Sequence, residues 1–340
     1  MRVANSIEVP AAVLNILLNE TDSGHLLSAS DIGVRLQELE IPCSRKTIYR
    51  AVEVLNTYGF DVRYEISGKE KGYRIEHLLS PAEAWVLMNA VNESPSLSAK
   101  ESENLLRKLS QILSEHDRRS ISVPPPSAVK TDNDHVTEMI GILLEAIRDV
   151  KPVEFVYYDI TVTRQKKYRR SHSRYHLIPY MIVSSGGRFY CVFYSEKHKA
   201  FANYRLDKME DITVIDEPAQ SVPFDPQAHI RSSFQMYRGD AQTVTAEFDI
   251  SLTNVVFDQF GSDIIITNVS GGTFTAAIRT SLSPTLTGWL LQFYDRVTVL
   301  HPASLKEELC HIAETLLLKY SHVKEGENNG GQNSETAGDH

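Results

Sequence analysis

Residues 44–55 read SRKTIYRAVEVL, and this stretch decides how the first part of the chain folds. Its apolar residues recur at helical spacing: Ile48, Ala51, Val52 and Leu55. A rotation of about 100° per residue brings them onto one side of a helix. Ser44 stands directly before them and predicts the helix N-cap. The helix therefore has one apolar side, and its basic residues lie opposite.

Two earlier helices and a strand pair surround this helix. Apolar residues recur at helical spacing over residues 12–18 and in a second helix that starts after Ser28 or Ser30, either of which could cap it, and runs to residue 39. Residues 62–66 and 72–75 alternate as two strands joined by a turn. Three helices followed by a hairpin resemble the winged helix-turn-helix of bacterial regulators. The resemblance implies a DNA-binding domain over residues 10–79.

In a helix-turn-helix, the second helix of the motif presents its first residues to the major groove. The candidate DNA contacts on this helix and on the hairpin tip are Arg45, Lys46, Thr47, Tyr49, Arg50, Lys69 and Lys71. Lys and Arg bind phosphates or guanine edges, and Thr binds phosphate. Up to residue 79 the chain has nine basic and eleven acidic residues, so affinity for double-stranded DNA depends on local placement and on a homodimer. A solvated face on a protein-binding winged helix is the alternative.

Residues 80–133 predict a helical linker region. A capping box with Pro at the first helical position spans residues 80–83 and begins one helix, and a second helix covers about residues 98–116. Residues 120–133 contain three consecutive prolines and predict a stiff exposed linker.

Two further domains follow the linker. Residues 134–217 combine one amphipathic helix with several β-prone runs, which favour a small β-barrel or a strongly bent sheet. Residues 243–320 have the order strand, helix, strand, strand, helix, strand, which predicts a ferredoxin-like domain closed by a final helix. Residues 323–340 lack apolar periodicity and predict a disordered tail.

Composition limits the function classes. The chain has 340 residues, a net charge of −9 and no apolar run long enough to span a membrane, and its N-terminus does not have the pattern of a signal peptide. We therefore expect a cytoplasmic protein without membrane partners. Three cysteines without a CxxC pair predict neither a disulfide framework nor a zinc site.

The known catalytic and cofactor motifs are missing from the sequence, so we expect neither an enzyme nor a cofactor or metal. A nuclease or phosphotransferase that uses His172 or His176 with Arg205 is the enzymatic alternative. It is disfavoured because residues 160–195 contain no carboxylate that could hold a metal or serve as a base. The same stretch carries seven basic residues and predicts a binding site for an anionic ligand.

Several motifs resemble, in order, the signatures of a WYL domain. They are VEFVYY at 153–158, HLIPY at 176–180, RFYCV at 188–192 and YRLDKM at 204–209. The family's Trp-Tyr-Leu is Phe-Tyr-Cys here, at residues 189–191. GWLLQF at 288–293 and VTVLHP at 297–302 resemble the C-terminal extension of such regulators. The resemblance covers about residues 10–320.

This resemblance implies a multidomain α+β transcription regulator whose WYL domain is a Sm-like β-barrel that senses an effector. A nucleic acid or a nucleotide is the favoured ligand, because basic grooves with aromatic faces bind single strands. The candidate effector-binding residues are Tyr157, Arg174, His176, Arg188, Tyr190 and Arg205. Core packing is the alternative for the aromatic residues, and an ion pair with Asp207 is the alternative for Arg205. An accessory nucleic-acid-binding protein, for example in phage defence, is the alternative to a regulator.

Overall fold

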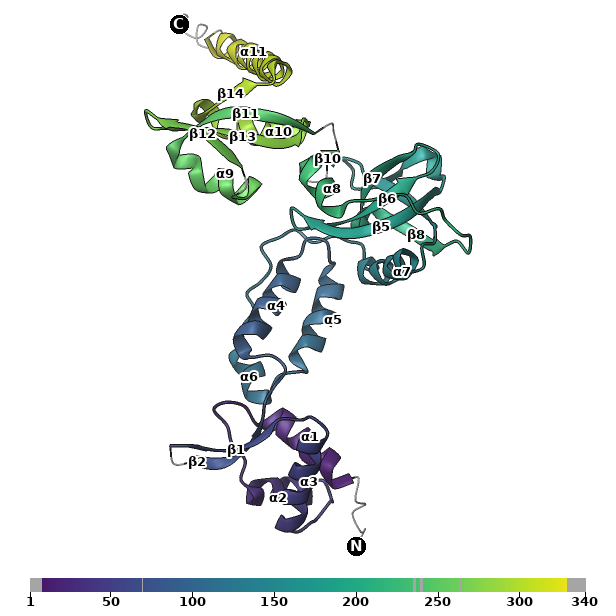
Figure 1. Ribbon diagram of the computed structural model, residues 1–340, viewed down its shortest axis with the longest axis vertical. Helices are drawn as coiled ribbons and strands as arrows, with labels where there is room; N and C mark the ends of the chain where they lie inside the picture. Colours follow the sequence, from purple (N-terminus) through teal and green to yellow (C-terminus); the bar gives the residue numbers. More distant parts are fainter. Residues whose placement is uncertain (1–7, 69, 235–236, 239–240, 263, 329–340) are drawn as a thin grey trace, which may run out of the picture. The chain divides into compact units, whose positions relative to one another are not determined.

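The computed structural model describes the chain in five stretches. These are residues 8–68, 70–234, 237–238, 241–262 and 264–328. The chain divides into two compact units, Met1–Ile142 with Leu206–Lys208 and Leu143–Arg205 with Met209–His340 (Figure 1). Within the described residues, no helix combines the length and the apolar character that crossing a membrane requires. The predicted mixed α+β, multidomain class is confirmed.

Three helices and a hairpin begin the first unit. They are α1 (Glu8–Glu20), α2 (Ala29–Glu38), α3 (Arg45–Thr57), β1 (Val62–Ser67) and β2 (Glu70–Ile75). Ser28 caps α2 in a capping box with Asp31, and the Ser44 hydroxyl caps α3 by accepting the Thr47 N–H. The apolar sides of these elements form one core: Val13, Leu17, Ile32, Leu36, Ile48, Leu55, Val62 and Ile75.

A short bridge fastens the hairpin to the helices. The Leu27 N–H donates to the Tyr73 carbonyl over 3.0 Å, and the Tyr73 N–H donates to the Leu27 carbonyl over 2.7 Å. This close approach requires glycine at position 72, because a Cβ on Gly72 would lie 2.5 Å from the Leu27 carbonyl oxygen. The bridge therefore fixes the position of the hairpin relative to the loop between α1 and α2.

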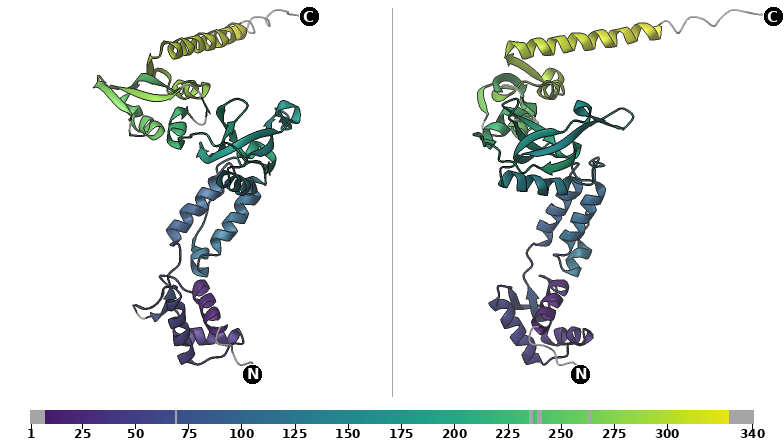
Figure 2. Two further views of the ribbon diagram at one scale, coloured as in Figure 1. Left: turned by 45° about the vertical axis from the view of Figure 1, so that its right-hand side comes forward. Right: turned by 90° about the vertical axis from the view of Figure 1, so that its right-hand side faces the viewer.

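A helical hairpin follows in the same unit. It consists of α4 (Pro81–Glu93) and α5 (Ala99–Ser110), which lie side by side, and the short α6 (Glu115–Ser120) comes next (Figure 1, Figure 2). The prediction of one helix over residues 98–116 is wrong. The Ser114 hydroxyl accepts the Asp117 N–H over 3.0 Å and so begins a new helix.

The segment between α6 and α7 (Val136–Arg148) is anchored rather than free. The Trp85 indole N–H donates to the Ser122 carbonyl over 3.1 Å, and the Asn92 amide donates to the Pro124 carbonyl over 2.8 Å. The three prolines are exposed as predicted, but the segment is held against α4.

A six-stranded antiparallel sheet forms the first part of the second unit. Its strands are β3 (Val153–Ile160), β4 (Lys166–Tyr168), β5 (Tyr175–Ser185), β6 (Arg188–Ser195), β7 (Ala200–Arg205) and β8 (Met209–Val214). β3 changes partner along its length, from β5 at residues 153–155 to β4 at 158–160, and pairs with β8 on its other edge. A closed barrel needs its two edge strands to pair, and no pairing joins β7 to β8 within described residues 153–214. The expected Sm-like barrel is therefore a curled half-barrel.

The last part of the chain is a four-stranded sheet with three helices. Its elements are β11 (Ala241–Asp249), α9 (Thr253–Phe260), β12 (Ile265–Ser270), β13 (Thr273–Ser281), α10 (Pro284–Leu291), β14 (Val297–His301) and α11 (Ala303–Asn328), and α8 (Pro226–Ser232), β9 (Ser233–Phe234) and β10 (Tyr237–Arg238) precede them. The strand order is β12-β13-β11-β14. The predicted disordered tail overlaps α11 at residues 323–328, because the helix continues to Asn328 (Figure 2). Residues 329–340 of that tail lie outside the described residues.

Candidate nucleic-acid interface and effector site

The exposed side of α3 presents three of the predicted DNA contacts. Lys46, Tyr49 and Arg50 are exposed, whereas Ile48 and Leu55 on the other side are buried. The separation follows from the helical period, which places residues 46, 49, 50 and 53 opposite the apolar stripe. The first turns of α3 therefore offer two basic side chains to a partner.

Two other predicted contacts are tied to neighbouring residues. The Arg45 guanidinium donates to the Ser30 hydroxyl over 2.5 Å, which links α3 to α2. The Thr47 hydroxyl lies 2.9 Å from the Ser44 hydroxyl, within the cap of α3. These two side chains position the start of α3, and the structure gives each of them a partner within the domain.

The strand register gives the hairpin two different faces. Val62, Tyr64 and Ile66 lie opposite Ile75, Tyr73 and Lys71, in that order. The other face carries the charged residues of both strands: Arg63, Glu65, Glu70 and Arg74. Tyr64 and Ile66 are 53% and 73% exposed, so the first face runs from the core to an exposed apolar tip with one lysine. Lys69, the other predicted contact on the hairpin, lies outside the described residues.

A row of tyrosines joins α3 to this first face. The Tyr49 and Tyr73 ring centroids lie 6.4 Å apart, and those of Tyr64 and Tyr73 lie 5.1 Å apart. Of these three tyrosines, only Tyr49 is among the DNA contacts predicted from the sequence. The period of two along residues 62–66 gives the side on which Tyr64 lies, but only the hairpin register shows that Tyr64 faces Tyr73.

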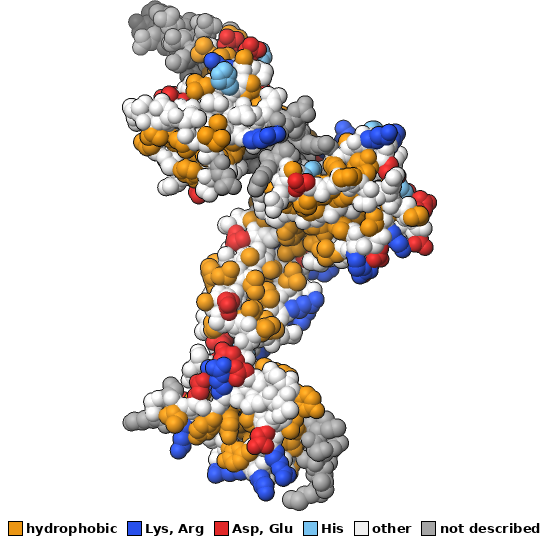
Figure 3. All heavy atoms as spheres, viewed as in Figure 1, with side chains coloured by type: hydrophobic (Ala, Val, Ile, Leu, Met, Phe, Trp, Pro, Cys, Tyr) orange, Lys and Arg blue, Asp and Glu red, His pale blue; other side chains and the backbone are white. Residues whose placement is uncertain are grey.

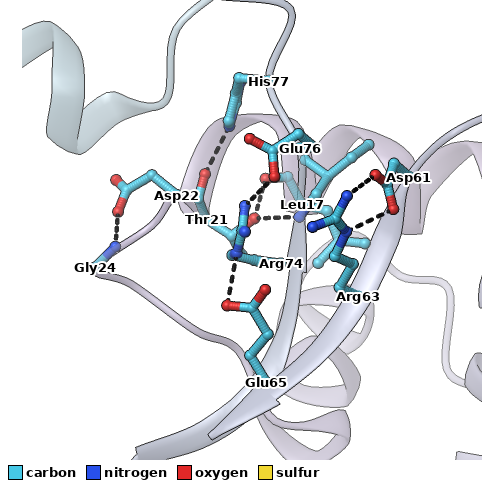
Figure 4. Close-up of polar contacts among 11 residues, drawn as sticks. Leu17, Thr21, Asp22, Gly24, Asp61, Arg63, Glu65, Arg74, Glu76 and His77 are labelled. Atoms are coloured by element: carbon cyan, nitrogen blue, oxygen red, sulfur yellow. Dashed lines mark hydrogen bonds and ion pairs between the residues drawn. The ribbon is translucent and has the colours of Figure 1, made fainter. Parts of the chain in front are cut away.

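The charged face of the hairpin is neutralised internally. The Arg74 guanidinium donates to Glu65 over 2.9 Å and to Glu76 over 2.8 Å, and Arg63 donates to Asp61 over 2.9 Å (Figure 4). The hydrogen bond from Arg63 holds the pKa of Asp61 below its ordinary value. Carboxylates surround the basic residues on this face, so it is a poor surface for phosphate.

The basic residues on α3 and on the other face of the hairpin differ from these paired arginines. Lys46, Arg50 and Lys71 form no ion pair with any residue in the described part of the chain, and all three are exposed. Figure 3 shows Lys and Arg side chains gathered on the part of the first unit that carries α2 and α3. Their charge is available to an anionic partner.

Three of the predicted effector residues come together on the curled sheet. The Tyr157 hydroxyl accepts the Arg205 N–H over 3.3 Å, and Arg205 lies directly opposite Tyr190 in the β6–β7 pair. Tyr157 is buried, whereas Tyr190 and Arg205 are half-buried. Arg188 begins β6 opposite Ser185, at the turn of the β5–β6 hairpin.

Arg174 and His176 share a different partner, Glu154. The Arg174 guanidinium donates to the Glu154 carboxylate over 3.1 Å, to the Thr213 hydroxyl over 2.9 Å and to the Asp211 carbonyl. His176 Nδ1 lies 3.5 Å from the same carboxylate. Arg174 therefore connects β3 and β8, which gives it a structural role in addition to the predicted role in ligand binding.

The structure adds an aromatic cluster that sequence reasoning missed. The Tyr204 ring centroid lies 5.2 Å from that of Tyr157 and 5.3 Å from that of Tyr175. Arg169 lies over the Tyr157 ring at 5.1 Å, and Arg170 lies over the Tyr175 ring at 4.1 Å. The sequence signal that could have indicated this cluster is the pair Arg169-Arg170 shortly before β5, which begins at Tyr175.

The backbone beside this cluster has an unusual conformation. Arg170, Ser171 and His172 have φ values of 50°, 51° and 68°, which are left-handed values that side-chain-bearing residues rarely adopt. Each such residue costs on the order of 1 kcal/mol or more unless the surroundings hold it. The contacts of Arg169 and Arg170 with the tyrosine rings hold this strained loop at the sheet.

The charge pattern expected for residues 160–195 is wrong in part. The sequence predicts seven uncompensated basic residues, but three of them have carboxylate partners: Lys166 pairs with Glu210, Arg169 with Asp159 and Arg174 with Glu154. These acids lie just outside the run and reach it because β3 and β8 pair beside it. Repulsion among the basic residues of 160–195 is therefore not a sufficient argument for an anionic ligand.

Family models match two stretches of the chain. A WYL domain matches residues 138–214, and a WCX domain matches residues 240–317. The chain therefore contains a WYL domain followed by a WCX domain. All six predicted effector residues lie within the WYL match, and the GWLLQF and VTVLHP motifs lie within the WCX match.

Solved structures that resemble this WYL-domain protein include proteasome accessory factor B/C (PafBC) of Arthrobacter aurescens, at 18% sequence identity and a TM-score of 0.28. That match covers 94% of this chain and 50% of the other, so the WYL-domain protein spans half the length of that relative. A CRISPR Cas-related protein matches at 15% identity and a TM-score of 0.38, over 94% of this chain and 84% of the other. No curated protein matches the sequence. The family models, and not these structures, identify the domains.

Proposed function

We propose that this WYL-domain protein is a cytoplasmic, homodimeric transcription regulator that binds duplex DNA through its N-terminal domain and senses an effector on its WYL sheet. The observation that carries the proposal is the contrast among the basic residues of the first domain. Arg63 and Arg74 pair with carboxylates, whereas Lys46 and Arg50, on one exposed side of α3, form no ion pair with any residue that the structure describes. Unpaired basic residues on an exposed helix can neutralise phosphates and release their counterions.

We infer that the N-terminal domain is a winged helix-turn-helix and the C-terminal domain is ferredoxin-like. The order α1, α2, α3, β1, β2 and the bridge between Leu27 and Tyr73 support the first inference. The second is supported by the strand order β12-β13-β11-β14, with α9 after β11 and α10 after β13.

For the effector we propose a single-stranded nucleic acid or a nucleotide at the surface that Tyr190 and Arg205 share. Aromatic rings stack on bases and guanidinium groups bind phosphates, which favours a ligand with both groups over a simple anion. The neighbouring Arg169 and Arg170 contribute positive charge, although Arg169 also pairs with Asp159. We infer a binding role and not catalysis, because the basic side chains nearest this surface contact carboxylates and rings.

Genome-wide DNA capture with the purified protein tests the regulator. We expect enrichment of specific sites upstream of genes, and we expect that enrichment to be lost in a protein carrying Lys46→Ala and Arg50→Ala. Arg63→Ala, which removes a neutralised arginine from the same domain, is the matched control and should retain it. Capture without any sequence preference would instead favour an accessory nucleic-acid-binding protein.

A further inference from the structure

The linker that follows β8 is docked on one face of the curled sheet. The Val222 N–H donates to the Tyr180 hydroxyl over 2.7 Å. Further along, His229 Nε2 on α8 donates to Asn203 Oδ1 over 2.8 Å. We call residues 222–229 the strap, because the segment is tied to β5 at one end and to β7 at the other.

The strap lies on the same face of the sheet as two of the candidate effector residues. In the β6–β7 pair, Tyr190 lies opposite Arg205, and Tyr194 lies opposite Phe201. Cross-strand partners share a face, and so do residues two apart along a strand. Asn203 stands between Phe201 and Arg205 on β7, so it lies on this face, about 7 Å from Arg205. The strap, which binds Asn203, is therefore next to the proposed effector surface.

Three aromatic rings form the part of this face that the strap covers. The ring centroids of Tyr180 and Tyr194 each lie 5.1 Å from that of Phe201. We call these three residues the aromatic patch. The Phe224 ring centroid lies 4.7 Å from that of Phe201 and 5.4 Å from that of Tyr180. The His229 ring centroid lies 6.2 Å from that of Phe201, so the strap places two flat rings against the patch.

The strap packs less tightly than the opposite face of the sheet. Phe155 and Phe193 on that face are 0% exposed, whereas the rings of the aromatic patch and of the strap are half-buried. Between Phe224 and His229, residues 225–228 are exposed. Segments with few buried contacts open at a low cost in free energy. The strap can therefore leave the patch while the core of the sheet stays intact.

The contacts of His229 are those that a nucleobase would make. Its imidazole is a flat heteroaromatic ring, and the same ring forms half of a purine. It lies against the Phe201 ring and bonds to the carbonyl of the Asn203 amide. Sheets that bind single strands stack bases on aromatic side chains, and asparagine recognises adenine through its N6 and N7 atoms. The aromatic patch and Asn203 therefore have the groups that bind an adenine base.

We propose that the aromatic patch and Asn203 form a nucleobase subsite of the effector surface, and that the strap occupies this subsite until a base displaces it. The phosphates of the same strand would then lie toward Arg205, about 7 Å along β7. A single strand that contains adenine uses both groups, whereas a simple anion would use Arg205 alone and leave the strap in place. The inference rests on the effector of the proposed function, and it adds the position of the base and the segment that competes with it.

Fluorescence anisotropy with a labelled single-stranded oligodeoxyadenylate and an abasic strand of equal length tests the subsite. For Phe224→Ala with His229→Ala, we expect the Kd for the oligodeoxyadenylate to fall about 10-fold, because a site that is closed in about nine-tenths of the molecules gains this factor when it is freed. The Kd for the abasic strand should not change. The matched control, Gln227→Ala with Ile230→Ala, removes exposed side chains of α8 and should bind both strands like the wild type. Adding Asn203→Ala to the strap variant should reverse the gain.

Hydrogen–deuterium exchange of the wild type tests displacement of the strap without any substitution. Saturating oligodeoxyadenylate should speed the exchange of the amides of residues 222–229, because a base in the subsite releases the Val222 N–H from the Tyr180 hydroxyl. The abasic strand should leave this exchange unchanged. This measurement decides the inference even where the strap variant loses stability, which its melting temperature would show.

The outcomes separate the subsite from the effector surface. Oligodeoxyadenylate that binds while the strap exchanges at its ligand-free rate, or more slowly, would overturn the subsite and leave the effector surface standing. An equal gain of the strap variant for the abasic strand would do the same, because the strap would then shield only charge. Failure of both the wild type and the strap variant to bind either strand would overturn the effector of the proposed function together with the subsite.

Discussion

Up to residue 79 the chain has more acidic than basic residues, whereas residues 160–195 have seven basic residues and no acidic one. In three dimensions this contrast is smaller, because carboxylates pair with three of the seven basic residues in 160–195. Among the described residues, Lys46 and Arg50 on α3 form no ion pair, whereas Lys166 and Arg174 pair with acids from neighbouring strands. The charge available to a partner is therefore decided by pairing across strands and helices, and not by the count along the chain.

The largest expected effect concerns the unpaired residues. Lys46→Ala and Arg50→Ala should each weaken binding to a captured duplex by about 1 to 3 kcal/mol if the side chain reads a base, and should reduce the salt dependence if it contacts phosphate. Fluorescence anisotropy at several salt concentrations measures both. Arg35→Ala removes an arginine that Glu20 and Glu38 already pair, and it should change little. Unchanged affinity and salt slope in both test variants would remove α3 from the interface.

The effector surface gives the second prediction. A single-stranded oligonucleotide at about 100 times its Kd should stabilise the protein by roughly 2.7 kcal/mol, because a ligand that binds only the folded state adds RT ln(1 + [L]/Kd). Arg205→Ala should remove most of this gain, and Tyr190→Ala should remove the part that depends on stacking. The experiment measures the melting temperature with the oligonucleotide and, for comparison, with a simple polyanion of equal charge. Equal stabilisation by both ligands, with no effect of Tyr190→Ala, would show that this surface is not the sensing site.

The paired residues should matter for stability instead of for binding. Arg174→Ala leaves the Glu154 carboxylate, the Asp211 carbonyl and the Thr213 hydroxyl without their donor, so we expect a loss of about 1 to 2 kcal/mol. Arg164→Ala, in the exposed turn before β4, is the control and should be close to neutral. Equal melting temperatures for the two variants would contradict the structural role of Arg174.

The smallest effect is a dependence on pH. Burial alone would raise the pKa of Glu210, but hydrogen bonds from Lys166 and Tyr168 hold it below its ordinary value. A carboxylate whose pKa is lowered by folding stabilises the protein above its unfolded pKa of about 4.3, and this contribution disappears as the pH falls through the folded pKa. Glu210→Gln should therefore lower the melting temperature at pH 7 and match the wild type in acid. A difference that grows on acidification would have the wrong sign.

The sequence predicted the local elements of the candidate sites well. The cap at Ser44 and the exposure of Lys46, Tyr49 and Arg50 follow from residue types and the helical period alone. The place of Tyr204 beside Tyr157 could not be predicted, because it depends on how β3, β5 and β7 curl together. The break between α5 and α6 was missed because the apolar spacing of α5 continues to Ile112 and Leu113, beyond the end of that helix, and only the cap at Ser114 marks the start of α6.

By itself, the sequence determined the order of helices and strands and the sides on which their apolar residues lie, because capping and periodicity act within a few neighbouring residues. Only the tertiary structure decided which charges pair, and that the curled sheet stays open between β7 and β8 within the described residues. These features join residues far apart in the chain: Lys166 reaches Glu210, and Lys130 reaches Val91. Their distances depend on how whole elements pack, and local preferences do not fix that packing.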